Sequence, residues 1–509
     1  ILTFMNNWIF KKDLTLPTGA YLQKLVDKIK DHSKQNIDLD EFLKPILQII
    51  FKFANNPWIT QEEIFSELKI SKDKLLFLNK FIRENQYIQN LIIKEGAGYK
   101  YWQSISPFCK NLENSINNKF SYPMRIAFYP GVSCMYFCGF CGRNQEAKYP
   151  LNAVDAGLDM YKSVISELDP ENTAISISGG LEPLTNPKIG EIIEFSSNHG
   201  LRVPLITNGH SLTENNIKKH QGLKKLDSIR ISLYGVDEKS YEFITTIKKS
   251  YKTVKRNCIN FLKFRNDVNP NIKFGLNYII LKENIADLPK LINFISEVNS
   301  EIDNGQGINF LSLRDDFDTV TGISDKSDSK RKYHLSGLLN DKDREKLAKI
   351  FDELENSSVI NNLHIDYGYA LHSIKNGITN NYLKKVNDKE MRKFGHTQMS
   401  VAIDLFGDVF LYREAGFLNR NGNEKFIIGR INEKNSLKSI IKNFLENSNG
   451  INNSLNDVRF MDPFDHVLTS LINQAEKDSK FGIPFEDGPV LIRSNPKKIN
   501  LGNSWYKNV

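Results

Sequence analysis

The 509-residue sequence contains no run of about 18 apolar residues, so a membrane-spanning helix is not expected. It has no Walker-type phosphate loop, no two separate Cys-x-x-Cys pairs and no His-x-x-x-His pair. The first absence excludes a P-loop nucleotide site, and the other two leave a structural zinc site without its usual four ligands. Low-complexity tracts and internal repeats are also absent. The net charge of +8 is a modest excess that fits solubility as well as attraction to anions.

Cysteine is scarce, with only five in the chain, and a disulfide framework is not expected in a protein this long. Three of the five, Cys134, Cys138 and Cys141, nevertheless lie within eight residues in the spacing CxxxCxxC. Thiolates are soft ligands that suit iron–sulfur clusters, and a [4Fe–4S] cluster normally takes four of them. Three cysteines therefore predict a cluster with one iron left open for a small molecule. Cys109 and Cys258 are interpreted as ordinary buried thiols.

Residues 1–115 precede the cysteines and are predicted to form a mostly helical domain. Within it, a helical pattern that starts at Thr60 and a second at Asp73–Asn85 are followed by a strand pair at Tyr87–Trp102. Helix, turn, helix and strand pair is the order of a winged-helix module, which often binds DNA. The pattern has no base-reading basic helix, so we favour a packing or docking role and do not expect nucleic acid as a partner.

The central region alternates strand and helix patterns, which indicates an α/β domain with parallel strands. Six short segments are predicted strands: Arg125–Gly131, Ala174–Gly180, Val203–Gly209, Ser228–Gly235, Lys273–Leu281 and Gly307–Arg314. Predicted helices between them include Asp155–Leu168, Ile189–His199 and Leu288–Val298. Six units are too few to close an eight-stranded barrel. Residues 120–320 are therefore predicted to form a partial (β/α)6 TIM-type barrel with its chemistry at the C-terminal ends of the strands.

Residues 321–509 are predicted to form a C-terminal α+β extension that covers the barrel mouth. A polar stretch at residues 316–335 leads into it. A helix at Asp341–Glu355 follows, and then a hairpin at His396–Arg413 that turns at Phe406-Gly407-Asp408. No cysteine lies beyond Cys258, so ligands for a second cluster are absent from this region.

Glycine and polar residues gather where the predicted strands end. The second strand runs into Ser178-Gly179-Gly180-Leu181-Glu182-Pro183, and two adjacent glycines let the backbone approach a ligand closely. His210 and Tyr234 follow the third and fourth strands, and side-chain alternation directs both toward the substrate space. For His210, an ordinary loop position is the alternative. Arg314 at the end of the sixth strand suits a carboxylate or phosphate, with a salt bridge as the alternative.

The segment Tyr129–Arg143, YPGVSCMYFCGFCGR, resembles the cysteine loop of the radical S-adenosylmethionine (SAM) enzymes. SGGLEP is similar to their GGEP-type motif, with one residue inserted before the glutamate. The resemblance implies a [4Fe–4S] cluster on the three cysteines, with the open iron chelating the methionyl amino and carboxylate groups of SAM. Cleavage of SAM then yields a 5′-deoxyadenosyl radical. The implied SAM contacts are Phe140, Gly179, Gly180, Glu182, Asn208, Ser232, Asn277 and Arg314.

Five stretches, SGGLEPLTNP, RISLYGVD, KFGLNYIIL, FLSLRDDF and GDVFLYREAGF, resemble the radical SAM enzymes that act on dTDP-sugars in desosamine biosynthesis. This resemblance implies hydrogen abstraction from a dTDP-linked amino sugar followed by loss of ammonia. The implied partners are the nucleotide sugar and a flavodoxin- or ferredoxin-type electron donor in the cytoplasm. For the arginines, ion pairing is the alternative to binding the diphosphate. The implied substrate contacts are Arg143, His210, Tyr234, Arg413, Glu414 and Arg420.

Three other functions stay open at this point. A radical SAM dehydrogenase acting on another sugar or aminocyclitol usually carries a further cluster for the second electron. An epimerase needs a hydrogen donor such as the Cys258 thiol. A redox-sensing DNA-binding protein would use the winged helix but would not need the strand-end motifs.

Overall fold

The computed structural model describes residues 109–315 apart from 145 and 304, and residues 339–359, 363–367 and 395–448. It also describes residues 450, 451 and 455–462 and the isolated positions 45, 71, 73, 74, 77, 371, 374, 465 and 469. The predicted winged-helix-like domain at residues 1–115 lies almost wholly outside this part, and so does the polar stretch at 316–335. Both stay predictions.

The described strands form one ten-stranded sheet in the order β10-β9-β8-β1-β2-β3-β4-β5-β6-β7. Neighbours from β8 to β7 in this order pair in parallel, whereas β9 is antiparallel to both β8 and β10. Strands β1 to β6 coincide with the six predicted strands, which confirms the parallel α/β core. The bounds are β1 Arg125–Tyr129, β2 Ala174–Ile177, β3 Pro204–Thr207, β4 Ser228–Leu233, β5 Lys273–Ile280, β6 Phe310–Asp315, β7 His364–Tyr367, β8 Ser400–Asp404, β9 Asp408–Phe410 and β10 Ile427–Arg430.

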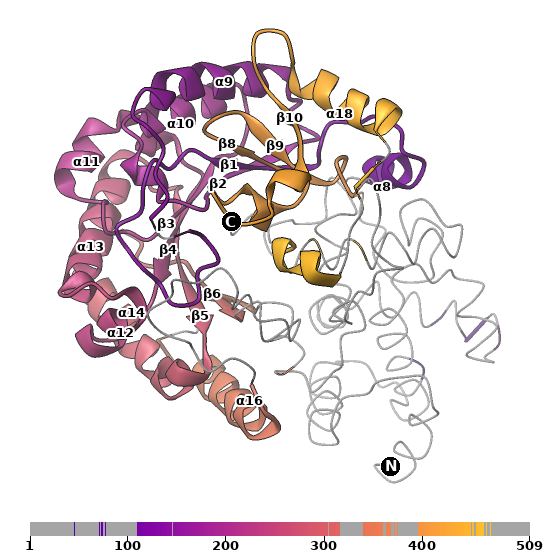
Figure 1. The fold of residues 1–509 in the computed structure, drawn as a ribbon. Helices are drawn as coiled ribbons and strands as arrows, with labels where there is room; N and C mark the ends of the chain where they lie inside the picture. The colour runs from indigo at the N-terminus through magenta and orange to yellow at the C-terminus, as the bar shows by residue number, and fades with distance from the viewer. Residues whose placement is uncertain are drawn as a thin grey trace.

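Helices form an arc around the outside of the curved sheet (Figure 1). The predicted helices at 155–168, 189–199 and 341–355 are confirmed as α9, α10 and α16. The one predicted at 288–298 begins three residues later, as α14, because a 3₁₀ segment at Lys282–Lys290 occupies its start. The arc consists of α9 Ala153–Glu167, α10 Ile189–Asn198, α11 Glu214–Lys219, α12 Glu238–Thr245, α13 Ser250–Val268, α14 Leu291–Ser300 and α16 Asp341–Glu355, with α8 Cys109–Ile116 and α18 Leu437–Asn447 at its other end.

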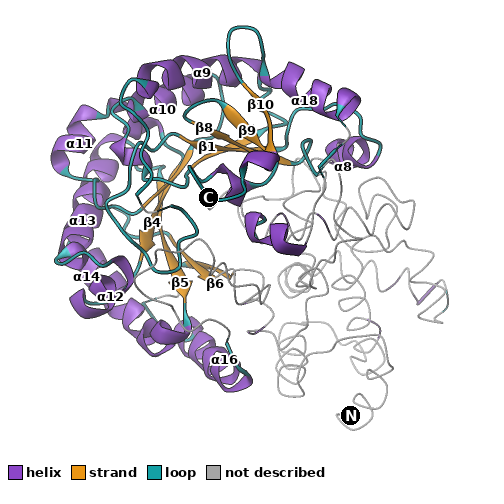
Figure 2. Cartoon of the chain, viewed as in Figure 1, coloured by secondary structure: helices purple, strands orange, loops and turns teal. Residues whose placement is uncertain are grey.

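The helices lie along the outer side of the sheet and leave its inner side to loops (Figure 2). In β4, Ile229, Ile231 and Leu233 belong to the main apolar core, and Arg230 and Ser232 alternate with them. Because successive side chains of a strand point to opposite faces, these two polar residues face away from the helix layer. The inner face of the sheet is therefore where polar chemistry can gather.

The predicted C-terminal hairpin is confirmed, but it extends the barrel sheet and forms no separate layer in the described residues. Strand β8 pairs in parallel with β1, Arg125 opposite Ser400 and Phe128 opposite Ile403. Strand β9 then turns back beside it, after a turn in which Gly407 has φ +83°. The prediction of a covering extension missed this pairing, since a contact between strands so far apart in sequence leaves no local signal.

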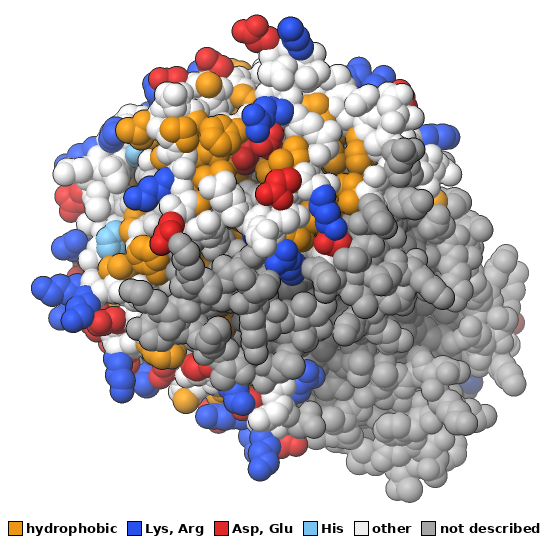
Figure 3. Space-filling view, viewed as in Figure 1, with side chains coloured by type: hydrophobic (Ala, Val, Ile, Leu, Met, Phe, Trp, Pro, Cys, Tyr) orange, Lys and Arg blue, Asp and Glu red, His pale blue; other side chains and the backbone are white. Residues whose placement is uncertain are grey.

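The visible described surface mixes acidic and basic side chains, and lysine and arginine are frequent along the outer edge near α11 and α13 (Figure 3). None of the described helices is long and apolar enough to cross a membrane.

Candidate active site at the cysteine loop

The three clustered cysteines lie in the loop that follows β1, at the C-terminal end of that strand. This loop is held against the turn that follows β2. The Glu182 amide donates to the Ser133 carbonyl at 2.9 Å, and Thr185 Oγ1 accepts from the Ser133 amide at 3.1 Å. Gly131 permits the close approach, because a Cβ there would lie 2.6 Å from the Leu181 carbonyl carbon. The two predicted motifs are thus brought together.

The other side of the loop rests on the C-terminal end of α12. The Phe137 amide donates to the Thr245 carbonyl at 3.1 Å, and the Gly139 amide donates to Ile244 at 3.2 Å. Inside the loop, the Arg143 guanidinium donates to the Tyr136 carbonyl. This bond links the end of the loop to the segment between Cys134 and Cys138. The cysteine positions are therefore fixed by backbone contacts on two sides.

The three thiols lie close enough to interact electrostatically. Cys138 is buried, and Cys134 and Cys141 are half-buried. Burial raises the pKa of Cys138 well above its usual value, and the charges of Cys141 and Cys134 raise it further, while Arg143 opposes the rise. Burial raises the pKa of Cys134 to about 11, again against the effect of Arg143. These raised pKa values disfavour the thiolate forms. A positively charged ligand bound to the three sulfurs would stabilise the thiolates and so offset the effect of burial.

Glu182 fastens the turn after β2 to the end of β3. Its buried carboxylate accepts from Thr207 Oγ1 at 2.5 Å, from the Asn208 amide at 2.8 Å and from the Leu184 amide at 3.1 Å. Burial raises the pKa of Glu182, and these three hydrogen bonds counteract the rise. The predicted SAM contact is therefore also an internal clamp. Gly179, with φ +148°, gives the turn a backbone conformation that other residues rarely adopt.

Asn208 and His210 connect the end of β3 to the cysteine loop. Asn208 Nδ2 lies 3.8 Å from Cys134 Sγ and 3.2 Å from Met135 Sδ. His210 Nδ1 lies 3.0 Å from the Tyr136 hydroxyl, which donates if the ring carries its proton on Nε2. Burial lowers the pKa of His210, which favours this neutral form. The predicted loop histidine thus lies beside the loop that carries the cysteines.

An aromatic group lines the loop on its α12 side. Phe140 packs on Tyr234 with ring centroids 5.7 Å apart, and Tyr136 packs on Tyr234 at 5.8 Å. The buried Tyr234 phenol lies within hydrogen-bonding reach of Ser232, and burial raises its pKa well above the usual value. Phe140, Ser232 and Tyr234 are thus brought together as predicted.

A polar row crosses the inner face at the level of Ser232. The register places Asn277 of β5 beside Ser232, Ser312 of β6 beside Asn277, and Asp366 of β7 beside Ser312. Arg314 Nη2 binds Asp366 Oδ2 at 2.6 Å, so the salt bridge considered for Arg314 is present.

The chain was compared with known proteins. The family model described as "Radical SAM superfamily" matches residues 128–295. The chain is also 33% identical over 444 residues to the dTDP-4-amino-4,6-dideoxy-D-glucose ammonia-lyase of Streptomyces venezuelae, covering 86% of this chain and 88% of that protein. The chain belongs to the radical SAM superfamily. It is an enzyme family whose members use SAM and a [4Fe–4S] cluster.

Two further similarities are weaker. The AdoMet-dependent heme synthase of Methanosarcina barkeri is 24% identical over 35% of this chain and 48% of its own length. The crystal structure of SuiB from Streptococcus suis shares 15% identity and a TM-score of 0.42, over 79% of this chain and 81% of its own.

The cysteine loop fits the cluster of a radical SAM enzyme. No three His, Cys, Asp or Glu side chains converge on a single ion in the part of the chain that is described. A cubane cluster does not need such convergence, because each cysteine binds its own iron at a separate corner. Cys258 is fully buried in the core on α13, so it does not supply a fourth sulfur. Cys109 begins α8, and its side chain lies outside the described part.

The three arginines predicted to bind substrate are engaged inside the protein. Arg143 closes the cysteine loop, as described above. Arg413 Nη1 lies 3.0 Å from Asp462 Oδ2, and its Nη2 lies 3.2 Å from Ser178 Oγ. Arg420 Nη1 binds Glu414 Oε2 at 3.1 Å, and its guanidinium lies over the rings of Phe417 and Phe460. The ion-pair alternative is thus present for Arg413, Glu414 and Arg420, and their contact with substrate stays a prediction.

Sequence reasoning missed several polar residues that the structure places beside the predicted site residues. Tyr136 was overlooked although it stands between two of the cysteines, a position that could have identified it. Asp366 and Asp462 gave no such signal, because their arginine partners lie far away in sequence. Arg230 was also missed, although its place between two apolar residues of a predicted strand already indicated an inward-facing charge.

Proposed function

We propose that this chain is a radical SAM lyase that removes ammonia from a dTDP-linked amino sugar. The observation that carries the proposal is the 33% identity to an ammonia-lyase named for such a sugar, which extends over 88% of that protein. The similarity includes the regions before and after the superfamily match at residues 128–295. It therefore supports a shared reaction as well as a shared core.

In this proposal, Cys134, Cys138 and Cys141 would hold the cluster and leave one of its irons open for SAM. When bound, the cluster and SAM together supply a 5′-deoxyadenosyl radical that removes a hydrogen atom from the substrate. Asn208, 3.8 Å from Cys134 Sγ, donates toward the sulfur and stabilises its negative charge. Arg143 contributes a compensating positive charge from inside the loop.

SAM binds along the ends of β2 to β4. The backbone of Gly179 and Gly180 would bind the methionyl amino group, and the Glu182 carboxylate fastens this turn to the end of β3. Ser232 orients the ribose or carboxylate, and Phe140, packed on Tyr234, stacks near the adenine. These residues position the reacting carbon and exclude water, which are the protein's contributions when a cofactor carries the chemistry.

The substrate occupies the remaining inner face. His210 and Tyr234 border it on the cysteine side, and the half-buried His210 ring, whose pKa burial lowers, contributes a polar contact without a charge. Loss of a hydrogen atom from the hydroxyl-bearing carbon next to the amino group would leave a substrate radical. Its hydroxyl would give up a proton as the amino group leaves as ammonia, and the remaining α-keto radical would take one electron from the electron donor and one proton. Epimerisation with Cys258 as hydrogen donor is disfavoured, because this thiol is fully buried on the helix side of the sheet.

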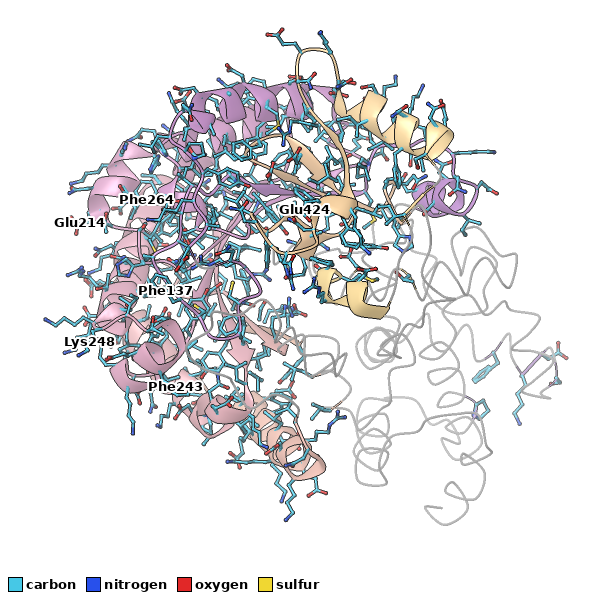
Figure 4. All side chains as sticks on the ribbon, viewed as in Figure 1. Phe137, Glu214, Phe243, Lys248, Phe264 and Glu424 are labelled. Carbon is cyan, nitrogen blue, oxygen red and sulfur yellow. The ribbon has the colours of Figure 1, made fainter. Side chains whose placement is uncertain are left out.

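The electron enters beside the cysteine loop. Phe137 and Phe243 are large apolar residues that are 39% and 45% exposed, and Lys248 and Lys249 lie exposed just after α12. Figure 4 labels Phe137, Phe243 and Lys248. This aromatic–basic face, defined by these four residues, suits an acidic carrier of flavodoxin or ferredoxin type. A cluster of this kind needs the reducing environment of the cytoplasm.

The test is incubation of the reduced, cluster-loaded protein and SAM with candidate dTDP-amino sugars, followed by mass analysis. We expect loss of ammonia from one of them, with one 5′-deoxyadenosine formed for each hydrogen abstracted. A product that has lost two hydrogens and kept its nitrogen would overturn the lyase proposal in favour of a dehydrogenase. Equal turnover of a free sugar would overturn the nucleotide-sugar proposal.

A further inference from the structure

The inner face of β4 to β6 carries buried polar groups whose hydrogen-bonding capacity is unused. Arg230 of β4 is only 7% exposed, and its Nε and Nη1 atoms have no hydrogen-bond partner among the residues that the structure describes. Asn277 Oδ1 and Ser312 Oγ are buried and likewise without a partner there. Such groups, and a charged one above all, destabilise a protein unless a ligand or water satisfies them.

These three side chains lie close together on one face. Asn277 and Ser312 are register partners on neighbouring strands, about 4.8 Å apart in the hydrogen-bonding direction. Arg230 is paired with Gly275, which comes two residues before Asn277 on β5. Arg230 therefore lies on the same face as Asn277 but two residues nearer the N-terminal ends of the strands. Gly275 has no side chain, and the ring of Phe310 on β6 packs directly over it, so the neighbour of Arg230 at this level is an apolar ring that offers it no acceptor. A single ligand on this face could therefore contact one cationic side chain and two neutral polar side chains.

The neighbouring charged groups do not balance the positive charge of Arg230. Burial lowers its pKa to about 9, and repulsion by Arg314 contributes, whereas Asp366 opposes the shift. The Asp366 carboxylate is already bound by Arg314 at 2.6 Å. Arg230 is still protonated at neutral pH, so the inner face holds a buried positive charge that an anionic ligand would stabilise.

We propose that Arg230 binds the diphosphate of the nucleotide-sugar substrate, with Asn277 and Ser312 binding the ligand hydroxyls next to it. The identity of this anion rests on the proposed function. Arginine is the residue best suited to a phosphate, because its planar fork can donate two parallel hydrogen bonds. The predicted diphosphate ligands Arg143, Arg413 and Arg420 already donate to Tyr136, Asp462 and Glu414.

The position of Arg230 distinguishes the diphosphate from the SAM carboxylate. Tyr234, directly after the same strand, is affected by the charges of Cys138 and Cys134, whereas the groups that act on Arg230 are Arg314, Asp366 and Arg125. Four residues of a strand span about 13 Å. Arg230 is therefore farther from the cysteines than Ser232, the SAM contact of the proposed function on the same strand, and suits the far end of a long substrate.

The experiment is calorimetric titration of the cluster- and SAM-loaded protein with thymidine diphosphate, and in a second arm with thymidine. We expect Arg230→Met to weaken thymidine diphosphate binding by about ten- to hundredfold, the effect of a hydrogen bond to a charged group. Thymidine and SAM affinities should not change. The melting temperature should stay the same or rise, since no internal hydrogen bond of Arg230 is lost.

The matched control is Arg265→Met. Arg265 is also a buried arginine, but it donates to Asn309 Oδ1 at 2.7 Å and to the carbonyls of Ile272 and Gly307 at 3.1 Å. This variant should lose thermal stability and keep its affinity for thymidine diphosphate. The opposite pattern in the two variants is what separates a ligand site from a structural arginine.

Two outcomes would overturn the proposal. One is unchanged thymidine diphosphate affinity in Arg230→Met, and the other is a loss of SAM affinity in its place, which would assign Arg230 to the SAM carboxylate. The proposed function fails separately. If the wild-type protein binds thymidine diphosphate through Arg230 but consumes no dTDP-amino sugar, the anion site stands and the lyase assignment is wrong.

Discussion

Polar side chains serve different purposes at the two sides of the inner face. At the ends of β1 to β3, Glu182 accepts three hydrogen bonds and Arg143 ties the cysteine loop to itself. Along β4 to β6, in contrast, Arg230, Asn277 and Ser312 carry buried atoms without a partner in the described residues. The protein alone satisfies Glu182 and Arg143, whereas it leaves these atoms of Arg230, Asn277 and Ser312 unsatisfied.

This difference corresponds to two binding tasks. A cluster and SAM must be held in one fixed geometry, so the loop that positions them benefits from internal clamps. A substrate needs donors and a charge that are not already in use, and their buried state stabilises the ligand once water is excluded. The two sides therefore predict different responses to mutation: loss of the radical chemistry on one side, and loss of substrate affinity on the other.

The largest effect is expected at the cysteine side. Replacing Cys134, Cys138 or Cys141 with Ala should abolish SAM cleavage and most of the cluster absorbance, because each thiolate binds one iron. Production of 5′-deoxyadenosine and the visible spectrum are the measurements. Cys258→Ala is the matched control, since it removes a buried thiol from the helix side and should leave cleavage intact. Continued cleavage by Cys134→Ala would refute the assignment of the loop.

A smaller effect is expected when the clamp is removed. Glu182→Ala leaves the donors of Leu184, Thr207 and Asn208 without their acceptor, at roughly 1–3 kcal/mol for each buried group. We expect a lower free energy of unfolding in urea and SAM binding weaker by about ten- to hundredfold.

Glu191→Ala is the control for the clamp. Glu191 lies on the surface of α10, where its solvent-exposed ion pair with Lys188 should contribute little to stability. Equal unfolding energies for Glu182→Ala and Glu191→Ala would contradict the clamp. Unchanged SAM affinity in Glu182→Ala would remove this residue from the SAM site.

The aromatic–basic face should affect only the supply of electrons. The double variant Phe137→Ser/Lys248→Glu should slow reduction by flavodoxin several-fold, most strongly at low salt, because steering by charge is screened by ions. SAM cleavage driven by dithionite should be unaffected. Lys434→Glu, the same charge change on the exposed turn before α18, is the control. A similar slowing with dithionite would mean that the cysteine loop itself was damaged.

Short-range patterns made much of this molecule predictable. The spacing of Cys134, Cys138 and Cys141 identified the loop, and alternating residues such as Ile229 and Ile231 identified the strands, because both signals lie within a few positions. The missed ion pairs and the missed strand pairing, in contrast, depend on distant partners.

Arg413 gave no sign that it would meet Asp462 and Ser178, which lie 49 and 235 positions away. The pairing of β8 with β1 was missed for the same reason, since only the folded sheet brings Ser400 beside Arg125. Polar residues were correctly expected at the strand ends, but their division between cofactor clamp and open ligand site depends on which of them find partners across the sheet.

The smallest expected effect concerns pH and His210. Burial lowers the pKa of this ring in the folded protein below its value of about 6.5 in the unfolded chain. The unfolded state therefore binds more protons in this range, so His210 contributes stability that is present above about pH 6.5 and is lost as the pH falls below it. His210→Gln should reduce the slope of the free energy of unfolding against pH on the acid side. The reduction should be less than about 1.4 kcal/mol per pH unit, the limit for one proton.

Tyr136→Phe is the control, because it removes the hydrogen bond to the His210 ring and leaves the burial of the ring unchanged. This variant should keep the slope, since burial is the cause of the lowered pKa. Urea titrations between pH 5 and about 8 measure both variants. A slope lost equally in Tyr136→Phe would show that the hydrogen bond, and not burial, holds the ring neutral beside the cysteine loop.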